Sequence, residues 1–166
     1  MQGNITRLVG SLTDGIGKTA LRRMFRSIGA RMSSQATATA GLVIKTGGSA
    51  LAKTGSTAYA GTVNGVPVAI AASTDMPALT GINITAAYYR VVCFFIDAGS
   101  TVTAVGGAEG ATLATAKFPD FPLDKTLVGY LVITYASAFT GGTTPLDTAT
   151  TVYVSPVGAF DPTITI

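Results

Sequence analysis

The chain has 166 residues, of which 48% are hydrophobic and only 11% are charged, and its formal net charge is +3. This length is enough for one domain with a buried core, but the charged share is far below the roughly 25% that is usual in soluble proteins. Histidine is absent and cysteine occurs once, which excludes a histidine-based catalytic pair, an internal disulfide and a zinc site built on several cysteines.

The positive charge is concentrated near the N-terminus. Residues 1–34 contain six basic residues and one acid, whereas residues 35–166 contain five basic and seven acidic residues. The basic character therefore belongs to an N-terminal arm and not to the body of the protein.

The arm is predicted to be helical and amphipathic. Between residues 21 and 32, apolar residues follow the helical spacing i, i+3, i+4, i+7 and i+11. This stripe consists of Leu21, Met24, Phe25, Ile28 and Met32. A shorter repeat of the same kind lies within residues 5–12, and Gly15 and Gly17 predict a bend between the two.

A basic amphipathic helix fits several kinds of partner. It could neutralise nucleic-acid phosphates, lie on a membrane surface, dock its stripe on a protein, or pack on its own body. Phe25 is the only aromatic residue among the arginines, which disfavours stacking on single-stranded nucleic acid. We expect a protein partner, and the residues expected to bind it are Leu21, Arg22, Arg23, Met24, Phe25, Arg26, Ile28 and Arg31.

No catalytic, cofactor-binding or metal-ligating residues are predicted. Most of the acids stand beside glycine, proline or threonine in loops, where they build turns. Gly17-Lys18-Thr19 is like the end of a phosphate-binding loop, but that motif needs glycine where this chain has Leu12. We therefore expect a protein that is not an enzyme and that takes no cofactor and no small-molecule substrate.

Residues 35–40 are predicted to be a linker. The stretch SSQATATAG, residues 33–41, is small, polar and uncharged, and it offers little to bury. The predicted organisation is an arm over 1–34, a linker over 35–40 and a body over 41–166.

The body is predicted to be an antiparallel β-sandwich or a jelly-roll-like fold. Short β-type runs about ten residues apart, separated by glycine and proline turns, are typical of these folds. Asn64-Gly65 stands between two such runs and predicts a hairpin over 57–72. The other predicted strands cover 41–45, 85–96, 101–107, 111–118, 126–139 and 151–156, and the chain ends on the apolar residues 164–166.

The strand over 85–96 is apolar on both faces, with Arg90 as the exception. A strand with one face in water would alternate polar and apolar residues. We expect one face to meet the core and the other to meet either a second layer or another subunit. Cys93 lies in this strand and is predicted to be buried.

No membrane segment is expected. The longest uninterrupted apolar runs, such as 66–72 and 91–96, are far short of the roughly 18 residues that a spanning helix needs. We expect no secretory signal either, because no continuous apolar segment follows Arg7.

Several stretches of the body carry a resemblance when taken in order. The first begins GLVIKTGGSALAKTGSTAYAG and covers 41–79, and the others cover 94–114, KFPDFPLDKTLVGYLVI at 117–133, and 139–162. In these stretches the body resembles a family of small virion structural proteins of tailed bacteriophages. The resemblance implies a β-rich, non-catalytic component of the particle that forms a homotrimer, and the arm over 1–34 is extra to the family pattern.

We therefore expect a capsid decoration, or cement, protein that binds the major capsid protein at the capsid surface. Binding only to the assembled shell would stabilise that shell by mass action. The alternative is a tail or fibre accessory protein that contacts the host or other tail proteins through the loops 119–125 and 141–149. A second rival is a DNA- or membrane-contacting protein that works through the arm, but we expect neither partner.

Overall fold

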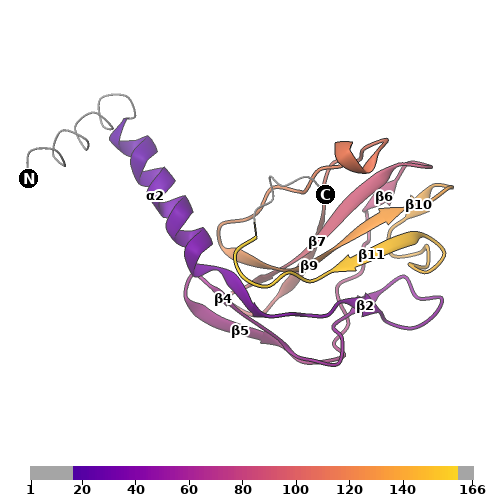
Figure 1. The fold of residues 1–166 in the computed structure, drawn as a ribbon, viewed down its shortest axis with the longest axis horizontal. Coiled ribbons are helices and arrows are strands. Elements are labelled where there is room, and N and C mark those ends of the chain that lie inside the picture. The colour runs from indigo at the N-terminus through magenta and orange to yellow at the C-terminus, as the bar shows by residue number, and fades with distance from the viewer. Residues whose placement is uncertain (1–16, 161–166) are drawn as a thin grey trace, which may run out of the picture.

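The computed structural model describes residues 17–160, apart from the side chains of Ser27, Ala30 and Arg31. The described chain is mainly β, with antiparallel sheets and one α-helix near the N-terminus, as the sequence predicted (Figure 1). Its elements are α2 (Lys18–Ser33), β1 (Gln35–Ala38), β2 (Val43–Ile44), β3 (Ala52–Lys53), β4 (Tyr59–Val63), β5 (Val66–Ile70), β6 (Asn83–Ile84), β7 (Tyr89–Asp97), β8 (Val102–Gly106), a 3-10 turn (Leu113–Thr115), β9 (Lys125–Thr134), β10 (Phe139–Thr140) and β11 (Thr150–Val154).

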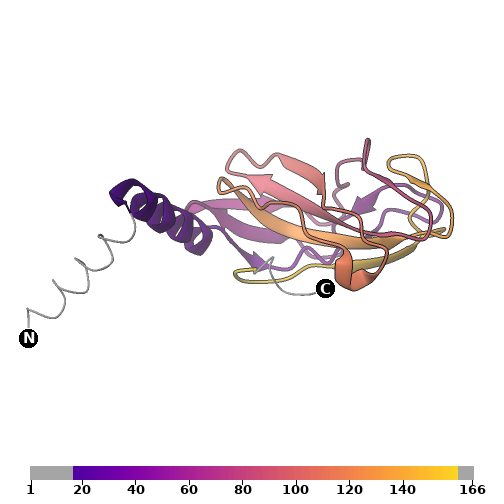
Figure 2. The ribbon, with the colours of Figure 1, turned by 90° about the horizontal axis from the view of Figure 1, so that it is seen from above.

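Two sheets form the body in a sandwich-like arrangement (Figures 1 and 2). One sheet has the strand order β11-β9-β7-β8 and the other has the order β1-β4-β5. Val63 and Val68 from the smaller sheet share one buried cluster with Phe94 and Leu131 from the larger sheet. The two short pairs β10-β6 and β2-β3 lie toward the end of the body away from α2.

The predicted hairpin is confirmed as β4 and β5. Asn64 and Gly65 have φ angles of 50° and 80°, which is the left-handed pair that a tight hairpin turn requires. The turn also joins the helix to the body. The Gly65 amide donates to the Ser33 carbonyl oxygen and the Asn64 amide donates to Ser34 Oγ, each over 2.9 Å.

Strands β7 and β9 are buried on both faces. On β7, Val92, Phe94 and Ile96 enter the core between the two sheets. Val91, Cys93 and Phe95 point to the other side, so the predicted burial of Cys93 is confirmed. There Phe118 and Phe121, from the loop before β9, and Phe160, from the C-terminal segment, form a second layer. The second face is therefore covered by the same chain and not by another subunit.

Arg90, the exception on β7, is satisfied at the edge of this layer. Its Nε donates to the Gly107 carbonyl oxygen over 2.8 Å, and its guanidinium lies 3.5 Å from the Glu109 carboxylate. These contacts tie the loop after β8 to the central strand.

The predicted linker is wrong, because residues 35–38 form β1 and pair with β4. Residues 35–40 gave no strand signal in the sequence because their apolar residues are only alanines. Ala36 and Ala40 are nevertheless buried, and small side chains suit a place where β1 also bonds to Gly158 across its other edge. The arm therefore continues directly into the sheet.

The predicted strand over 111–118 is also wrong. The hydroxyls of Thr112 and Thr115 bond to each other and to nearby backbone groups, which favours the 3-10 turn at Leu113–Thr115. The strands predicted over 41–45 and 126–139 are shortened to β2 and β9. The repeat over 5–12 and the end at 164–166 lie outside the described residues.

Replacing Phe95 by alanine is expected to lower the free energy of unfolding by about 3–5 kcal/mol, as much as replacing Phe94, because each side chain fills a buried layer of one chain. Urea unfolding of both variants measures this. The control Val152→Ala alters a side chain that is 53% exposed and should stay within about 0.5 kcal/mol of the unmodified chain. If Phe95→Ala behaves like the control, the aromatic layer does not stabilise the fold.

Tyr59 joins the two sheets and makes the fold sensitive to alkali. Its side chain is fully buried, and its hydroxyl donates to the Leu127 carbonyl oxygen on β9 over 3.3 Å. Burial raises the pKa of Tyr59 from 10.0 to about 12. Because the unfolded phenol loses its proton first, the stability from this group is complete below pH 10 and is lost as the pH rises through about 12.

Unfolding measured from about pH 9.5 to about pH 11.5 should therefore show a loss that is about 2 kcal/mol larger with Tyr59 than in Tyr59→Phe. Both chains should carry Cys93→Ala, because burial also raises the pKa of the Cys93 thiol. An equal loss with and without the Tyr59 hydroxyl would contradict this origin of the alkaline sensitivity.

Candidate partner-binding helix

Helix α2 projects from the body and joins it at its C-terminal end (Figures 1 and 2). The join includes the two hydrogen bonds from the hairpin turn to Ser33 and Ser34. At the other end Gly17 precedes the helix, and no side chain caps its first turn. The helix predicted from the apolar spacing is confirmed over Lys18–Ser33.

The apolar stripe of α2 is largely open to solvent. Phe25 is 62% exposed and Met32 is 73% exposed, while Met24 and Ile28 are exposed to 42% and 44%. Leu21 is half-buried. The possibility that this helix packs its stripe on its own body is therefore wrong, and the stripe is available to a partner.

The helix carries positive charge that nothing in the described chain neutralises. Arg22, Arg23 and Arg26 are exposed, and α2 contains no acid. Within residues 17–160 the ion pairs are Lys45–Asp75 and Arg90–Glu109, and both lie in the body. The side chain of Arg31 lies outside the described part.

These features leave α2 short of stabilising contacts. A 16-residue helix is marginal in water without packing. Arg22 and Arg26 are like charges at the i,i+4 spacing, and Lys18 stands where the helix dipole favours an acid. A partner that offers apolar surface or carboxylates would stabilise the helix as it binds.

The expected binding residues form two surfaces and not one. With 3.6 residues per turn, Arg22, Arg23 and Arg26 lie on the side of α2 opposite the stripe. We call this side the arginine face. One groove that holds the stripe cannot also surround the arginine face, so the arm can contact two different surfaces.

A second candidate surface lies on the body at the base of α2. An open depression of about 490 Å³, solvent included, lies beside Ser34, which directly follows the helix. Its lining residues are Ser34, Phe121, Pro122, Leu123, Lys125, Thr126, Leu127, Pro156, Gly158 and Phe160. Asp120 and Asp124 flank the lining loop in sequence, and both are exposed.

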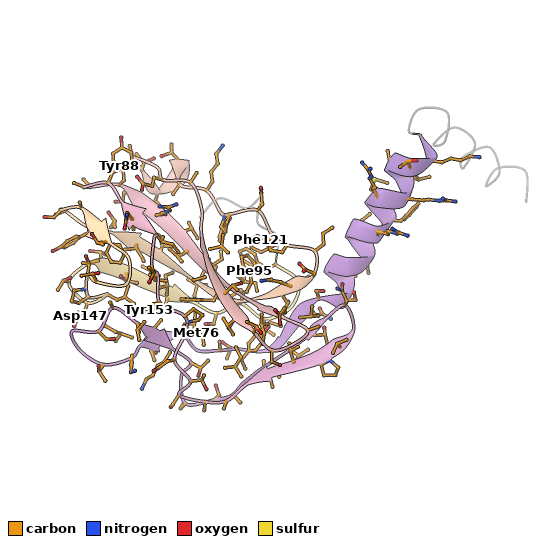
Figure 3. All side chains as sticks on the ribbon, turned by 180° about the vertical axis from the view of Figure 1, so that it is seen from behind. Met76, Tyr88, Phe95, Phe121, Asp147 and Tyr153 are labelled. Atoms are coloured by element: carbon orange, nitrogen blue, oxygen red, sulfur yellow. The ribbon has the colours of Figure 1, made fainter. Side chains whose placement is uncertain are left out.

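This surface beside the arm was not predicted from the sequence. The loops 119–125 and 141–149 were predicted together as possible host contacts. Figure 3 shows Asp147, in the latter loop, at the end of the body away from α2, with Phe121 nearer the helix. Asp147 accepts the Gly48 amide over 2.7 Å and so ties its loop to the loop after β2. The structure does not bring the two predicted loops into one site.

No protein-family model matches the chain, and neither the curated proteins nor the solved structures include a significant match. Among residues 17–160, no helix is long and apolar enough to cross a bilayer. The same residues contain no group of three or more cysteine or acidic side chains placed to hold a metal ion.

Ile28→Asp is expected to leave the free energy of unfolding within about 0.5 kcal/mol of the unmodified chain, because Ile28 does not contribute to the core. The matched change Ile70→Asp buries a charge in the hairpin, where the side chain is 7% exposed, and should cost at least about 3 kcal/mol. Urea unfolding compares the two. Equal losses would mean that α2 packs on the body in solution.

Proposed function

We propose that the protein is a non-enzymatic structural protein of a tailed-phage virion, which decorates the capsid as a cement protein. Helix α2 anchors it to the major capsid protein. The observation that carries the proposal is the exposed apolar stripe on a helix that meets the body at one end. The resemblance of the body to small phage virion proteins supports the class of particle.

The anchor works by laying the helix in a groove. Apolar residues at i, i+3, i+4 and i+7 are the pattern by which an amphipathic helix fills an apolar groove on another protein. Fully burying a side chain such as Phe25 or Ile28 contributes about 1.5–3 kcal/mol, less what the exposed helix already hides. Part of this gain offsets the ordering of the helix and the loss of free motion on binding.

Cementing follows if the groove is complete only between assembled capsid subunits. A protein that binds the shell and not its free subunits stabilises the shell by mass action. In a homotrimer, three anchors act together, so a modest affinity per helix gives strong attachment.

The alternative function is a tail or fibre accessory protein anchored by the same helix. It is favoured by the position of the loop 141–149 at the end of the body away from α2, where it would face outward. Copy number separates the two functions. A cement protein is present in numbers comparable to the capsid subunits, whereas a tail protein is present in few copies.

Phe25→Asp is expected to weaken binding to capsids stripped of this protein by at least about tenfold, because a charge replaces the most exposed aromatic anchor. Native mass spectrometry of the particles counts bound copies over a concentration series. Thr57→Asp is the control, since it adds the same charge at an exposed position of the body and leaves both faces of α2 unchanged.

The outcome that contradicts the anchor is unchanged binding of Phe25→Asp. A chain that begins at Ser33 gives a stronger form of the same test. It removes the helix but keeps Ser33 and Ser34, which bond to the hairpin turn. If that chain still saturates the capsid, the body and not the arm makes the contact.

A further inference from the structure

The arginine face remains without a partner when the stripe is anchored. Arg22, Arg23 and Arg26 point away from the stripe and have no ion pair within residues 17–160. The rest of the chain is acidic in balance, with seven acids against five basic residues over 35–166. The protein therefore carries both partners of an electrostatic contact, with the arginines on α2 and the excess of acids on residues 35–166.

The depression at the base of α2 has the chemistry that an arginine side chain needs. Phe121 and Phe160 offer aromatic surface, and Leu123 is 46% exposed at its edge. Such walls accept the aliphatic stem and the flat face of a guanidinium. Asp120 and Asp124 are exposed, without an ion pair in the described chain, and can accept hydrogen bonds from the guanidinium.

One basic residue also lines the depression. Lys125 belongs to its wall, but its Nζ lies 3.1 Å from Thr103 Oγ1, on β8. Thr103 is not a lining residue, so the Lys125 ammonium is turned across β7 toward β8. Asp120 and Asp124, which are exposed and flank the lining loop in sequence, remain available to pair with a cation.

The helix of the same chain does not supply the arginines. Arg26 stands seven residues before Ser33, roughly 10 Å along the helix axis, and α2 runs away from the body. Its side chain is exposed and makes no ion pair with Asp120 or Asp124. The matching helix must come from another molecule.

We propose that the depression beside Ser34 binds the arginine face of α2 from a second copy of this chain. Guanidinium groups of that helix pair with Asp120 and Asp124, and their stems pack on Leu123 and the aromatic wall. The contact joins arm to body, so it closes into a ring if the rotation between copies permits and otherwise continues as a chain. A ring of three fits the proposed homotrimer.

The pairing would also stabilise α2, which has few stabilising contacts of its own. Carboxylates of the second copy relieve the repulsion between Arg22 and Arg26. The stripe on the opposite side stays free for the capsid. The contact needs no capsid, so its test is independent of the proposed function.

A charge-reversal experiment on the full chain tests the pairing. The first variant carries Arg22→Glu and Arg26→Glu, the second carries Asp120→Arg and Asp124→Arg, and the third carries all four changes. Native mass spectrometry and light scattering at low and high salt measure self-association. Circular dichroism and urea unfolding confirm that each variant is folded.

The unmodified chain is expected to self-associate at low salt and to dissociate as salt screens the contact. The first and second variants should each raise the dissociation constant by at least about tenfold, because they replace attraction by repulsion. The third variant should restore association. A control with Lys53→Glu and Lys117→Glu makes the same change in net charge as the first variant and should associate normally.

Three results would overturn the proposal. The unmodified chain could remain monomeric at low salt and high concentration. The fourfold variant could fold but fail to associate, which would show that Asp120 and Asp124 are not the partners of the arginines. The first variant could also associate normally but lose binding to a short DNA duplex, which would assign the arginine face to nucleic acid.

Discussion

Strands β7 and β9 have no face in water, and the rest of the body is arranged to cover them. The smaller sheet covers one side, and the aromatic layer of Phe118, Phe121 and Phe160 covers the other. Phe95 and Phe121 meet edge to face with ring centroids 4.9 Å apart, so the second layer is packed and not merely adjacent. Because both covers belong to the same chain, the central strands need no subunit to bury them. The exposed apolar stripe of α2 therefore lies outside the core that these covers complete.

The same packing determines how α2 is presented. The hairpin turn at Asn64-Gly65 bonds to Ser33 and Ser34, and β4 of that hairpin reaches the core through Tyr59. The base of the helix is thus connected to the centre of the body, while its length extends outward. Its two sides differ in chemistry, which is why we assign the stripe to the capsid and the arginine face to a second copy. Every molecule also carries the depression at the helix base, which has Phe121 and Phe160 in its lining and the exposed Asp120 and Asp124 beside its lining loop in sequence.

Local patterns predicted the elements that depend on local physics. The spacing of Leu21, Met24, Phe25 and Ile28 predicted α2, and Asn64-Gly65 predicted the hairpin. Strand β1, which depends on distant partners, was missed. Strand β1 exists because Ala36 pairs with Gly61 and bonds to Gly158. An alanine-rich segment gives no local sign of such distant pairing partners. Likewise, the two apolar faces of β7 were visible, but only the fold shows that Phe118 and Phe160 cover the second one. The predicted binding residues lie on α2, but their division into two faces and the depression at the helix base required the structure.

The central claim is that α2 is the part of the molecule that meets the capsid. Hydrogen exchange of the full chain, free and bound to capsids stripped of this protein, tests it most directly. The exposed, weakly stabilised helix should exchange quickly in the free protein, whereas β7 and β9 should be protected in both states. Our account predicts that capsid binding slows exchange across residues 18–33 and leaves the central strands unchanged. Saturable binding that protects the loops of the body and leaves α2 in fast exchange would contradict it.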